Sequence, residues 1–287
     1  MFNMMASVAR KVMSTESEWN PKVFLGRFIA ALLPETVLHR LKRRYYSYLL
    51  ANMPDSWHEA DSSVVRHLVR AGDSVLDIGA SIGGYTRILS EMVGPSGHVY
   101  SFEPNPPIYE YLSYNVSRME LMNVHLHDCA LSDTAGTARI VIPRYRWGSE
   151  CHYDATLEAN RAGVECRHVD VSVRTLDSVL QGCPGQRISF LKCDVNYHEL
   201  ACLRGAMETL RNSKPAILIE ILPNPDRVGG PASAVFELLT ELGYTAYWFD
   251  GQALHKRQIG ERSQNYFFLM PESARLLPSR LFTRAAA

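Results

Sequence analysis

The sequence has no excess of charge of either sign. Its 30 Lys and Arg residues are matched by 30 Asp and Glu residues, so the formal net charge is +0 and the pI lies near 7.1. Domains that bind nucleic acids are usually basic. The overall charge therefore lacks the usual signature of that class, and no nucleic-acid partner is predicted.

Long apolar runs are missing as well. None reaches the roughly 18 residues that a membrane-spanning helix needs. The first residues also lack the uninterrupted apolar segment of a secretory signal. These two absences make the cytoplasm the expected location.

Closely spaced cysteine pairs are absent too. None of the 6 cysteines forms a C-x-x-C pair, and several lie inside apolar runs. This pattern is typical of free thiols in a reducing compartment. Two Cys–His neighbours, Cys151 with His152 and Cys166 with His168, match no structural zinc spacing. No metal site is predicted.

The N-terminal part of the sequence contains a basic segment with a helical pattern. Residues 1–20 are rich in Met and Ser and are predicted to be flexible, whereas residues 21–53 have helical spacing. Two interpretations of this helical extension, which ends near residue 60, stay open. It can be a cap packed on the main domain, or a segment that contacts an anionic membrane or an acidic substrate. The charged residues of 21–53 are Lys22, Arg27, Arg40, Lys42, Arg43 and Arg44, against the acid Glu35.

Strands and helices alternate in a main domain predicted over residues 61–275, with a tail at 276–287. The alternation predicts an α/β fold with a mostly parallel sheet covered on both faces. The last two strands are joined without a helix, which indicates an antiparallel strand at one edge. Residues 143–170 look irregular. The expected strands cover residues 74–78, 98–102, 124–130, 138–142, 188–193, 216–222, 245–249 and 265–270, with helices near 61–72, 85–92, 106–119, 200–210 and 231–242.

The first chemical signal is the stretch at residues 75–86, which reads VLDIGASIGGYT. In an open α/β sheet, ligands bind beyond the carboxyl ends of the strands. Glycines such as Gly79 and Gly83 let a ligand approach the backbone, and the helix that follows offers free N–H groups. The stretch therefore predicts a ligand-binding loop.

Spacing alone leaves the ligand open between NAD and S-adenosylmethionine. Gly79, Ser81 and Gly84 form only a degraded G-x-G-x-x-G pattern, and Glu103 lies where a carboxylate can accept from ribose hydroxyls. Asp77 shifts the balance. Its negative charge at the mouth of the loop would repel a pyrophosphate and attract an ammonium and a sulfonium.

The end of the third predicted strand adds another acid. The Asp128 carboxylate can accept from an adenine amino group, and the backbone N–H of Cys129 can donate to the ring. Asp77, Glu103 and Asp128 then line three successive strand ends. Three acids suit a cationic cofactor better than a pyrophosphate.

With these features the sequence resembles the FkbM-type family of S-adenosylmethionine-dependent O-methyltransferases, which have the class I methyltransferase fold. The resemblance covers about residues 72–270. The stretches that carry it are VLDIGASIGGYT, VYSFEPNPPIYEYLSYNV, CALSD, VRTLDSVL, FLKCDVNYHELACLRGA, PAILIEI and NYFFLM, in this order.

The resemblance implies a Rossmann-like, seven-stranded sheet whose last strand is antiparallel. It implies S-adenosylmethionine as cofactor and a hydroxyl of a glycan or secondary metabolite as acceptor. It also implies that the glycine-rich loop holds the methionine part, Glu103 the ribose and Asp128 the adenine. The predicted cofactor-binding residues are Asp77, Gly79, Ala80, Ser81, Gly83, Tyr85, Thr86, Glu103, Asp128 and Cys129.

The predicted catalytic residues lie in LKCDVNYHEL at residues 191–200. Methyl transfer to a hydroxyl needs an aligned acceptor and a base for its proton. Asp194 is predicted as base or substrate anchor, His198 as the competing base, and Glu199 as a site acid or a first-turn helix acid. The family usually has D-V-E-G-x-E here. Asn196 and Tyr197 therefore replace a Glu and a Gly, which marks a changed acceptor pocket or weakened chemistry.

The irregular stretch, residues 143–170, is predicted to be either an acceptor-binding lid or a disordered flap, because loops of this length are usually functional or disordered. Its aromatic and imidazole side chains suit a sugar or a polyketide; they are Tyr145, Trp147, His152 and Tyr153. The leading interpretation is an O-methyltransferase. A non-catalytic S-adenosylmethionine-binding protein and an NAD-dependent oxidoreductase stay as alternatives, and the oligomeric state stays open.

Overall fold

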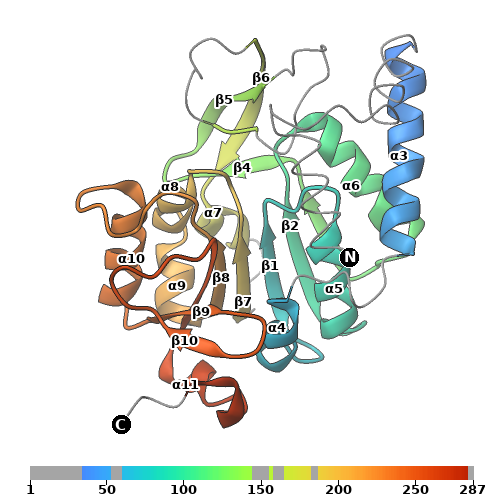
Figure 1. Ribbon diagram of the computed structural model, residues 1–287. Helices are drawn as coiled ribbons and strands as arrows, with labels where there is room; N and C mark the ends of the chain where they lie inside the picture. Colours follow the sequence, from blue (N-terminus) through green and yellow to red (C-terminus); the bar gives the residue numbers. More distant parts are fainter. Residues whose placement is uncertain (1–33, 53–59, 144–154, 158–164, 182–186, 284–287) are drawn as a thin grey trace, which may run out of the picture.

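The computed structural model of the chain describes residues 34–52, 60–143, 155–157, 165–181 and 187–283. These residues form an α/β fold with one large sheet, a small second sheet and helices on both faces of the large one (Figure 1). The predicted fold class is confirmed. The aromatic flap residues 145, 147, 152 and 153 and the segment 1–33 lie outside the described part of the chain.

The main sheet contains eight strands. In chain order they are β1 (Ser74–Ile78), β2 (His98–Phe102), β3 (Val124–His127), β7 (Ile188–Cys193), β8 (Ala216–Glu220), β9 (Thr245–Phe249), β10 (Leu254–Lys256) and β11 (Asn265–Leu269). Their spatial order is β10-β9-β11-β8-β7-β1-β2-β3. β1 lies at the centre and is buried along its whole length, as expected for a parallel strand covered on both faces.

The strand directions agree with the prediction of a mostly parallel sheet. Five strands that lie side by side, in the order β3-β2-β1-β7-β8, are parallel to one another. β11 is antiparallel to both β8 and β9, and the edge strand β10 is antiparallel to β9. The sheet has eight strands rather than seven because residues 254–256 return along β9 as β10.

The second sheet corrects two predictions. It consists of β4 (Cys129–Leu131), β5 (Gly136–Pro143) and β6 (Cys166–Arg174), in the order β4-β6-β5. The single strand expected at residues 124–130 is therefore split at Asp128, because β3 ends in the main sheet and β4 pairs with β6 instead. Part of the stretch expected to be irregular is the regular strand β6, whose alternating valines pack into a small core of their own.

The helices cover the main sheet on both faces. One core lies under α4 and α5, and the other lies under α8, α9 and α10 (Figure 1). The helices are α3 (Glu35–Ala51), α4 (Ser62–Leu68), α5 (Gly84–Val93), α6 (Pro106–Arg118), α7 (Leu176–Leu180), α8 (Glu199–Arg204), α9 (Met207–Ser213), α10 (Pro231–Glu241) and α11 (Pro271–Ala274).

The helix expected at residues 200–210 is broken at Gly205 into α8 and α9. The backbone of Ser132 approaches this position so closely that a Cβ on Gly205 would lie 2.0 Å from the Ser132 carbonyl oxygen. A side chain there would separate α8 from the end of β4. The break thus fixes where α8, and the loop before it, meet the carboxyl edge of the sheet.

Candidate active site

Three polar residues form a row across the centre of the main sheet. Asp77 on β1 pairs in register with Ser101 on β2 and with Lys192 on β7. Neighbours in register point to the same face of a sheet. All three are buried, in a sheet whose centre is otherwise apolar. This row is the base of the candidate site.

Asp77 is fully buried and only half satisfied. Its Oδ2 accepts a hydrogen bond from Thr86 Oγ1 at 2.6 Å, and Thr86 Oγ1 is 3.0 Å from Ser101 Oγ. Oδ1 is buried with no hydrogen-bond partner among the described residues. Burial raises the pKa of the Asp77 carboxyl, and the nearby Lys192 charge opposes that rise. A buried carboxylate oxygen without a partner is unfavourable unless a donor or a cation satisfies it.

The loop after β1 passes very close to the backbone at the end of β7. Gly79 has a φ of +80°, and a Cβ there would lie 1.9 Å from the backbone oxygen of Asp194. Gly83 has a φ of +99° and caps the start of α5. Between them, Ser81 adopts a left-handed φ of 51°. The loop therefore turns sharply between the ends of β1 and β7 and leaves the N-terminus of α5 facing the site.

Glu103, which directly follows β2, is hydrogen-bonded to this loop. Its two carboxylate oxygens accept hydrogen bonds from the backbone N–H groups of Ser81 and Asn105, each at 2.9 Å. Burial raises the pKa of Glu103 to about 7, although the two backbone hydrogen bonds favour the charged form. Glu103 is thus positioned at the carboxyl end of β2 with a carboxyl group that titrates near neutral pH.

Lys192 was missed by sequence reasoning. Its Nζ lies 3.2 Å from Asp194 Oδ2 and 5.0 Å from the centre of the Tyr85 ring. The lysine side chain is 10% exposed and that of Asp194 is 37% exposed. The signal was present as a lone lysine in the otherwise apolar strand ISFLKC. A buried cation between two carboxylates compensates their charge and holds Asp194 at the edge of the sheet.

The residues after Asp194 form a tight loop with two successive left-handed residues. Asn196 has a φ of 50° and Tyr197 a φ of 74°. Asn196 Nδ2 donates to the carbonyl oxygen of Ala155 at 3.1 Å, and Thr156 Oγ1 donates to the Asn196 carbonyl oxygen at 3.0 Å. The loop is thus fastened to residues 155–156, and Tyr197 is exposed at its surface.

The other two predicted catalytic residues make contacts within the protein. His198 Nε2 lies 3.0 Å from Ser132 Oγ, beyond the end of β4. Glu199 is buried at the start of α8 and accepts from the backbone N–H of Tyr197 at 2.9 Å. Burial raises its pKa to about 7. Glu199 thereby holds the strained loop.

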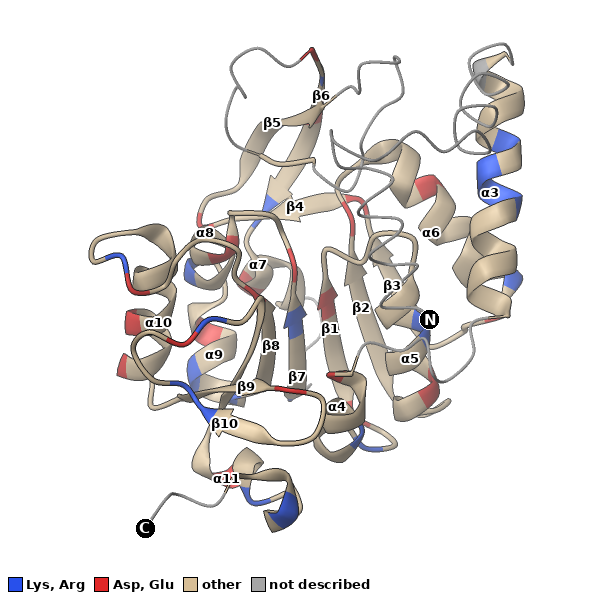
Figure 2. Ribbon diagram, viewed as in Figure 1, with Lys and Arg blue, Asp and Glu red and all other residues tan. Residues whose placement is uncertain are grey.

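The predicted adenine-side residues lie at the next strand end. Asp128 is exposed in the bend between β3 and β4, and Cys129 begins β4 with a buried side chain. Burial raises the pKa of the Cys129 thiol to about 11, so the thiol stays protonated at neutral pH. Both residues follow β3, which neighbours β2 and its Glu103. Asp77 therefore lies one residue before the end of β1, whereas Glu103 and Asp128 directly follow β2 and β3. Figure 2 shows an acidic residue within β1.

No group of three or more His, Cys, Asp or Glu side chains in the described ranges is arranged to hold a metal ion. The four cysteines within those ranges, Cys129, Cys166, Cys193 and Cys202, are free thiols. The same residues include no helix that is both long and apolar enough to cross a membrane.

A parallel sheet of this order with a glycine-rich turn after its central strand defines a class I methyltransferase domain. A family model described as the methyltransferase FkbM domain matches residues 77–246, more than half of the chain. The chain therefore belongs to the FkbM methyltransferase family, as its resemblance predicted. S-adenosylmethionine is the cofactor of these methyltransferases.

Two curated relatives match only a short part of the chain. The protein-L-isoaspartate O-methyltransferase of Methanothrix thermoacetophila is 40% identical over 58 residues, which are 20% of this chain and 28% of the relative. The enzyme of the same name from Ignicoccus hospitalis is 36% identical over 56 residues, 20% of this chain and 26% of the relative. The chain thus matches less than a third of the length of either relative.

Solved structures with a similar arrangement include the FkbM methyltransferase of Methylobacillus flagellatus KT. It is 13% identical with a TM-score of 0.42, over 81% of this chain and 59% of that one. Fibrillarin from Aeropyrum pernix, with S-adenosyl-L-methionine bound, is 14% identical with a TM-score of 0.41, over 72% and 71%. At these identities and scores, neither similarity bears on the methyl acceptor.

The residues present fit this cofactor. Asp77 Oδ1 is a buried acceptor without a donor in the part of the chain that the structure describes, next to a loop that lets a ligand reach the backbone. Glu103 and Asp128 follow at the ends of β2 and β3. An ammonium and a sulfonium are the groups that such a carboxylate-rich edge attracts.

Proposed function

We propose that this chain is an S-adenosylmethionine-dependent O-methyltransferase that acts on a hydroxyl group of a glycan or a secondary metabolite. The contact between Gly79 and Asp194 supports the proposal most directly. A Cβ on Gly79 would lie 1.9 Å from the Asp194 carbonyl oxygen. The backbone of the loop after β1, called the cofactor loop below, is therefore in direct contact with the backbone of Asp194, the candidate base. Methyl transfer needs the cofactor, the acceptor and the base to be held close together, and this contact brings the loop and the base side by side.

Three carboxylates would hold the cofactor, which supplies an electrophilic methyl group when bound. Asp77 would attract the ammonium of the methionine part through the carboxylate that is only half satisfied. Glu103 would accept from the ribose hydroxyls, since each of its oxygens retains a lone pair beyond its backbone hydrogen bond. Asp128 would accept from the adenine amino group.

Asp194 is the preferred candidate for the base. Its side chain is 37% exposed at the sheet edge, so an acceptor can reach it, and Lys192 orients it through Oδ2. The acceptor hydroxyl proton would pass to the Asp194 carboxylate as the acceptor oxygen forms its bond to the methyl carbon, the sulfur–methyl bond breaks and S-adenosylhomocysteine leaves. His198 and Glu199 are occupied by Ser132 and by the loop backbone, which favours positioning roles for both.

A non-catalytic S-adenosylmethionine-binding protein is the second candidate. The observation that favours it is the loop at Asn196 and Tyr197, where the family usually has Glu and Gly. Tyr197 adopts a backbone conformation with a φ of 74° that suits glycine better. Such a loop is compatible either with a changed acceptor pocket or with lost chemistry.

Cofactor binding and methyl transfer are tested separately. By calorimetry, we expect S-adenosylhomocysteine to bind in the micromolar range and NAD not to bind. Transfer of a labelled methyl group to glycan or metabolite extracts then separates an enzyme from a binding protein. NAD binding without S-adenosylhomocysteine binding would contradict the proposed cofactor.

The role of Asp194 is tested by Asp194→Ala. General-base catalysis contributes about 10²–10⁴-fold, so transfer should fall by at least about a hundredfold with little change in S-adenosylhomocysteine affinity. Glu272→Ala, an exposed acid in the first turn of α11, is the matched control and should retain full activity. Full transfer activity in the Asp194 variant would eliminate this residue as the base.

A further inference from the structure

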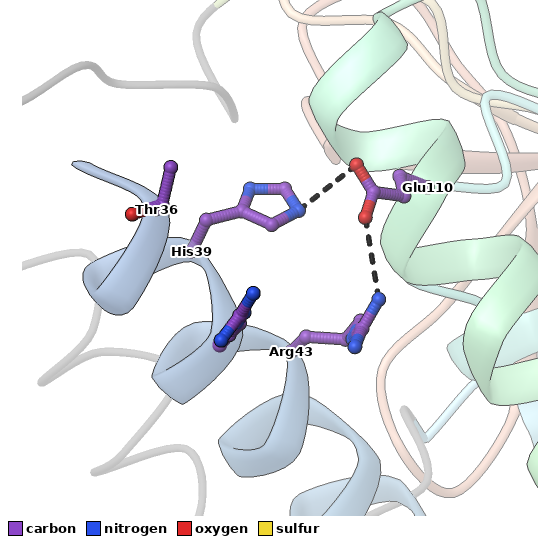
Figure 3. Close-up of a pocket in the computed structure, with 5 residues that line it drawn as sticks. Thr36, His39, Arg43 and Glu110 are labelled. Atoms are coloured by element: carbon purple, nitrogen blue, oxygen red, sulfur yellow. Dashed lines mark hydrogen bonds and ion pairs between the residues drawn. The ribbon is translucent and has the colours of Figure 1, made fainter.

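Helix α3 packs on the domain with a polar and aromatic face. His39 stacks on Tyr111 of α6 with ring centres 4.7 Å apart, and its Nε2 lies 3.0 Å from Glu110 Oε2. Arg43 pairs with Glu110 at 3.3 Å and lies over the Tyr114 ring at 4.5 Å. Figure 3 shows His39 and Arg43 pointing from α3 toward Glu110, around an open pocket that Thr36 also lines.

The opposite face of α3 is apolar and faces solvent. Val37, Leu41, Tyr45 and Tyr48 are 38%, 50%, 58% and 65% exposed. Their spacing of four, four and three residues places them on one stripe of the helix. An amphipathic helix normally turns such a stripe toward the core. Here the inner side of α3 buries Leu50 and packs Tyr46 against Tyr111, while this second apolar stripe faces outward without a partner from another element among the described residues.

Cations flank this stripe. Arg40 and Arg44 are exposed one turn apart along one side of the stripe, and Arg40 also lines the pocket beside Glu110. Lys42 is half-buried on the other side of the stripe. Residues 36–52 contain no Asp or Glu. An apolar stripe with tyrosines between basic side chains is complementary to the interface of a negatively charged bilayer, where apolar groups enter the headgroup region and cations contact anionic lipids.

We infer that the outward face of α3, defined by Val37, Leu41, Tyr45, Tyr48, Arg40 and Arg44, binds the surface of an anionic membrane. The attachment to α6 supports this, because His39 and Arg43 hold the helix to the domain and leave the apolar stripe turned outward. The inference concerns where the protein acts and does not depend on the proposed methyl transfer.

α3 lies beside α6, which follows β2 and its Glu103, and it extends past the carboxyl ends of the central strands (Figure 1). A bilayer against the outward face of α3 would lie on the side of α3 that faces away from α6.

The test is sedimentation of the full chain with phosphatidylcholine vesicles that contain or lack phosphatidylglycerol. We expect binding only to the anionic vesicles, and weaker binding in high salt. Arg40→Gln with Arg44→Gln should weaken binding about fivefold for each cation removed. Leu41→Ser with Tyr45→Ser should weaken it more than tenfold, because it removes the apolar stripe.

A matched control replaces exposed apolar residues elsewhere. Met122 and Val228 are 90% and 93% exposed, so Met122→Ser with Val228→Ser should leave vesicle binding unchanged. Circular dichroism verifies that each variant is folded. Equal loss in the control, or no binding of the native chain to anionic vesicles, would overturn the inference.

Hydroxyl-radical labelling of Tyr45 and Tyr48 tests whether other residues of the chain, or a second copy of it, cover the outward face of α3. Both tyrosines should be labelled in the free, full-length chain and protected when anionic vesicles are added. Protection in the free monomer would mean that the chain's own residues cover the face. Concentration-dependent protection, lost together with a dimer in the Leu41→Ser/Tyr45→Ser variant, would mean that a second copy does. Either result contradicts a membrane-binding role.

Discussion

At the scale of single residues, Tyr197 combines a bulky side chain with a backbone conformation that only glycine adopts freely. Its φ is 74°, and the preceding Asn196 is also left-handed. A left-handed backbone costs about 1–2 kcal/mol for a residue with a Cβ. Glu199 and Thr156 hold the loop in this shape through hydrogen bonds. The sequence marked this pair as a departure from the family, but the strain became visible only with the backbone angles.

Replacing Tyr197 by Gly should therefore stabilise the protein. We expect the free energy of unfolding to rise by about 1 kcal/mol, measured by urea denaturation, because glycine adopts the left-handed conformation without strain. Tyr197→Ala is the control, since it removes the ring and keeps the strain. If both variants change stability equally, the ring and not the backbone is responsible.

Glu103 should make cofactor binding depend on pH. Burial raises its pKa to about 7, so in the free protein the carboxyl is largely protonated at pH 6 and ionised at pH 8. The ionised form is the acceptor for the ribose hydroxyls. The affinity for S-adenosylhomocysteine should therefore increase as the pH rises through about 7. In Glu103→Gln this increase should be reduced, and binding at pH 8 should be about tenfold weaker.

Glu199 provides the comparison for Glu103. Its pKa is also raised by burial to about 7, but it contacts the loop backbone and not the proposed ribose position. For both groups the folded pKa lies above the unfolded value, so the charged form is disfavoured on folding, and stability is lost as the pH rises from about 4.5 to about 7. Glu199→Gln should change this pH dependence of stability and leave that of cofactor binding intact. Unfolding followed by scanning calorimetry and binding followed by titration calorimetry, both between about pH 5 and pH 8, separate the two cases.

At the scale of elements, the turn between β1 and α5 brings two distant segments into contact. Gly79 approaches the backbone of Asp194 so closely that no side chain fits, and the Asp194 N–H donates to the Ile78 carbonyl oxygen at 3.0 Å. A Cβ at Gly79 would force the ends of β1 and β7 apart. The positions of the cofactor loop and of Asp194, the candidate base, therefore both depend on Gly79.

Gly79→Ala should consequently destabilise the protein by about 3 kcal/mol or more, because it adds both a backbone clash and left-handed strain. S-adenosylhomocysteine binding should be lost. Gly84→Ala is the matched control. No atom lies within 4 Å of its added Cβ, and alanine favours the helix that begins there, so stability should stay equal or rise by about 0.5 kcal/mol. Thermal unfolding that shows equal losses in both variants would refute the special role of Gly79.

The elements that sequence reasoning found were those with a strong local pattern. The buried strand SVLDI and the helix after Asn105-Pro106 lie where they were predicted. The split between β3 and β4 escaped prediction because CAL is apolar and continues the strand pattern, whereas its partner β6 lies far away in the sequence. Likewise, the orientation of α3 could not be read from its period, since both of its faces contain apolar or aromatic residues.

At the scale of the whole molecule, the centre of the sheet contains two buried charged side chains, Asp77 and Lys192. Asp77 is fully buried, burial raises its pKa, and one of its carboxylate oxygens has no partner within the described ranges. Such a group opposes folding as the pH rises, because the folded state disfavours its charged form. Residues of this kind are typical of functional sites, where binding is favoured over stability.

Asp77→Asn should leave the stability of the free protein intact and weaken cofactor binding. The amide keeps an oxygen for the Thr86 hydroxyl and removes the buried charge, so the free protein at pH 8 should be as stable as the native chain or more stable. In the native protein, S-adenosylhomocysteine at about 100 times its Kd should add about 2.7 kcal/mol and raise Tm by several degrees. The variant should lose most of this rise, because its amide no longer attracts the ammonium group.

Thr240→Ser, on α10 and away from the strand ends, is the control and should retain the full rise in Tm. A variant that is less stable when free, yet gains the same increase on binding, would show that Asp77 holds the sheet together and does not hold the cofactor.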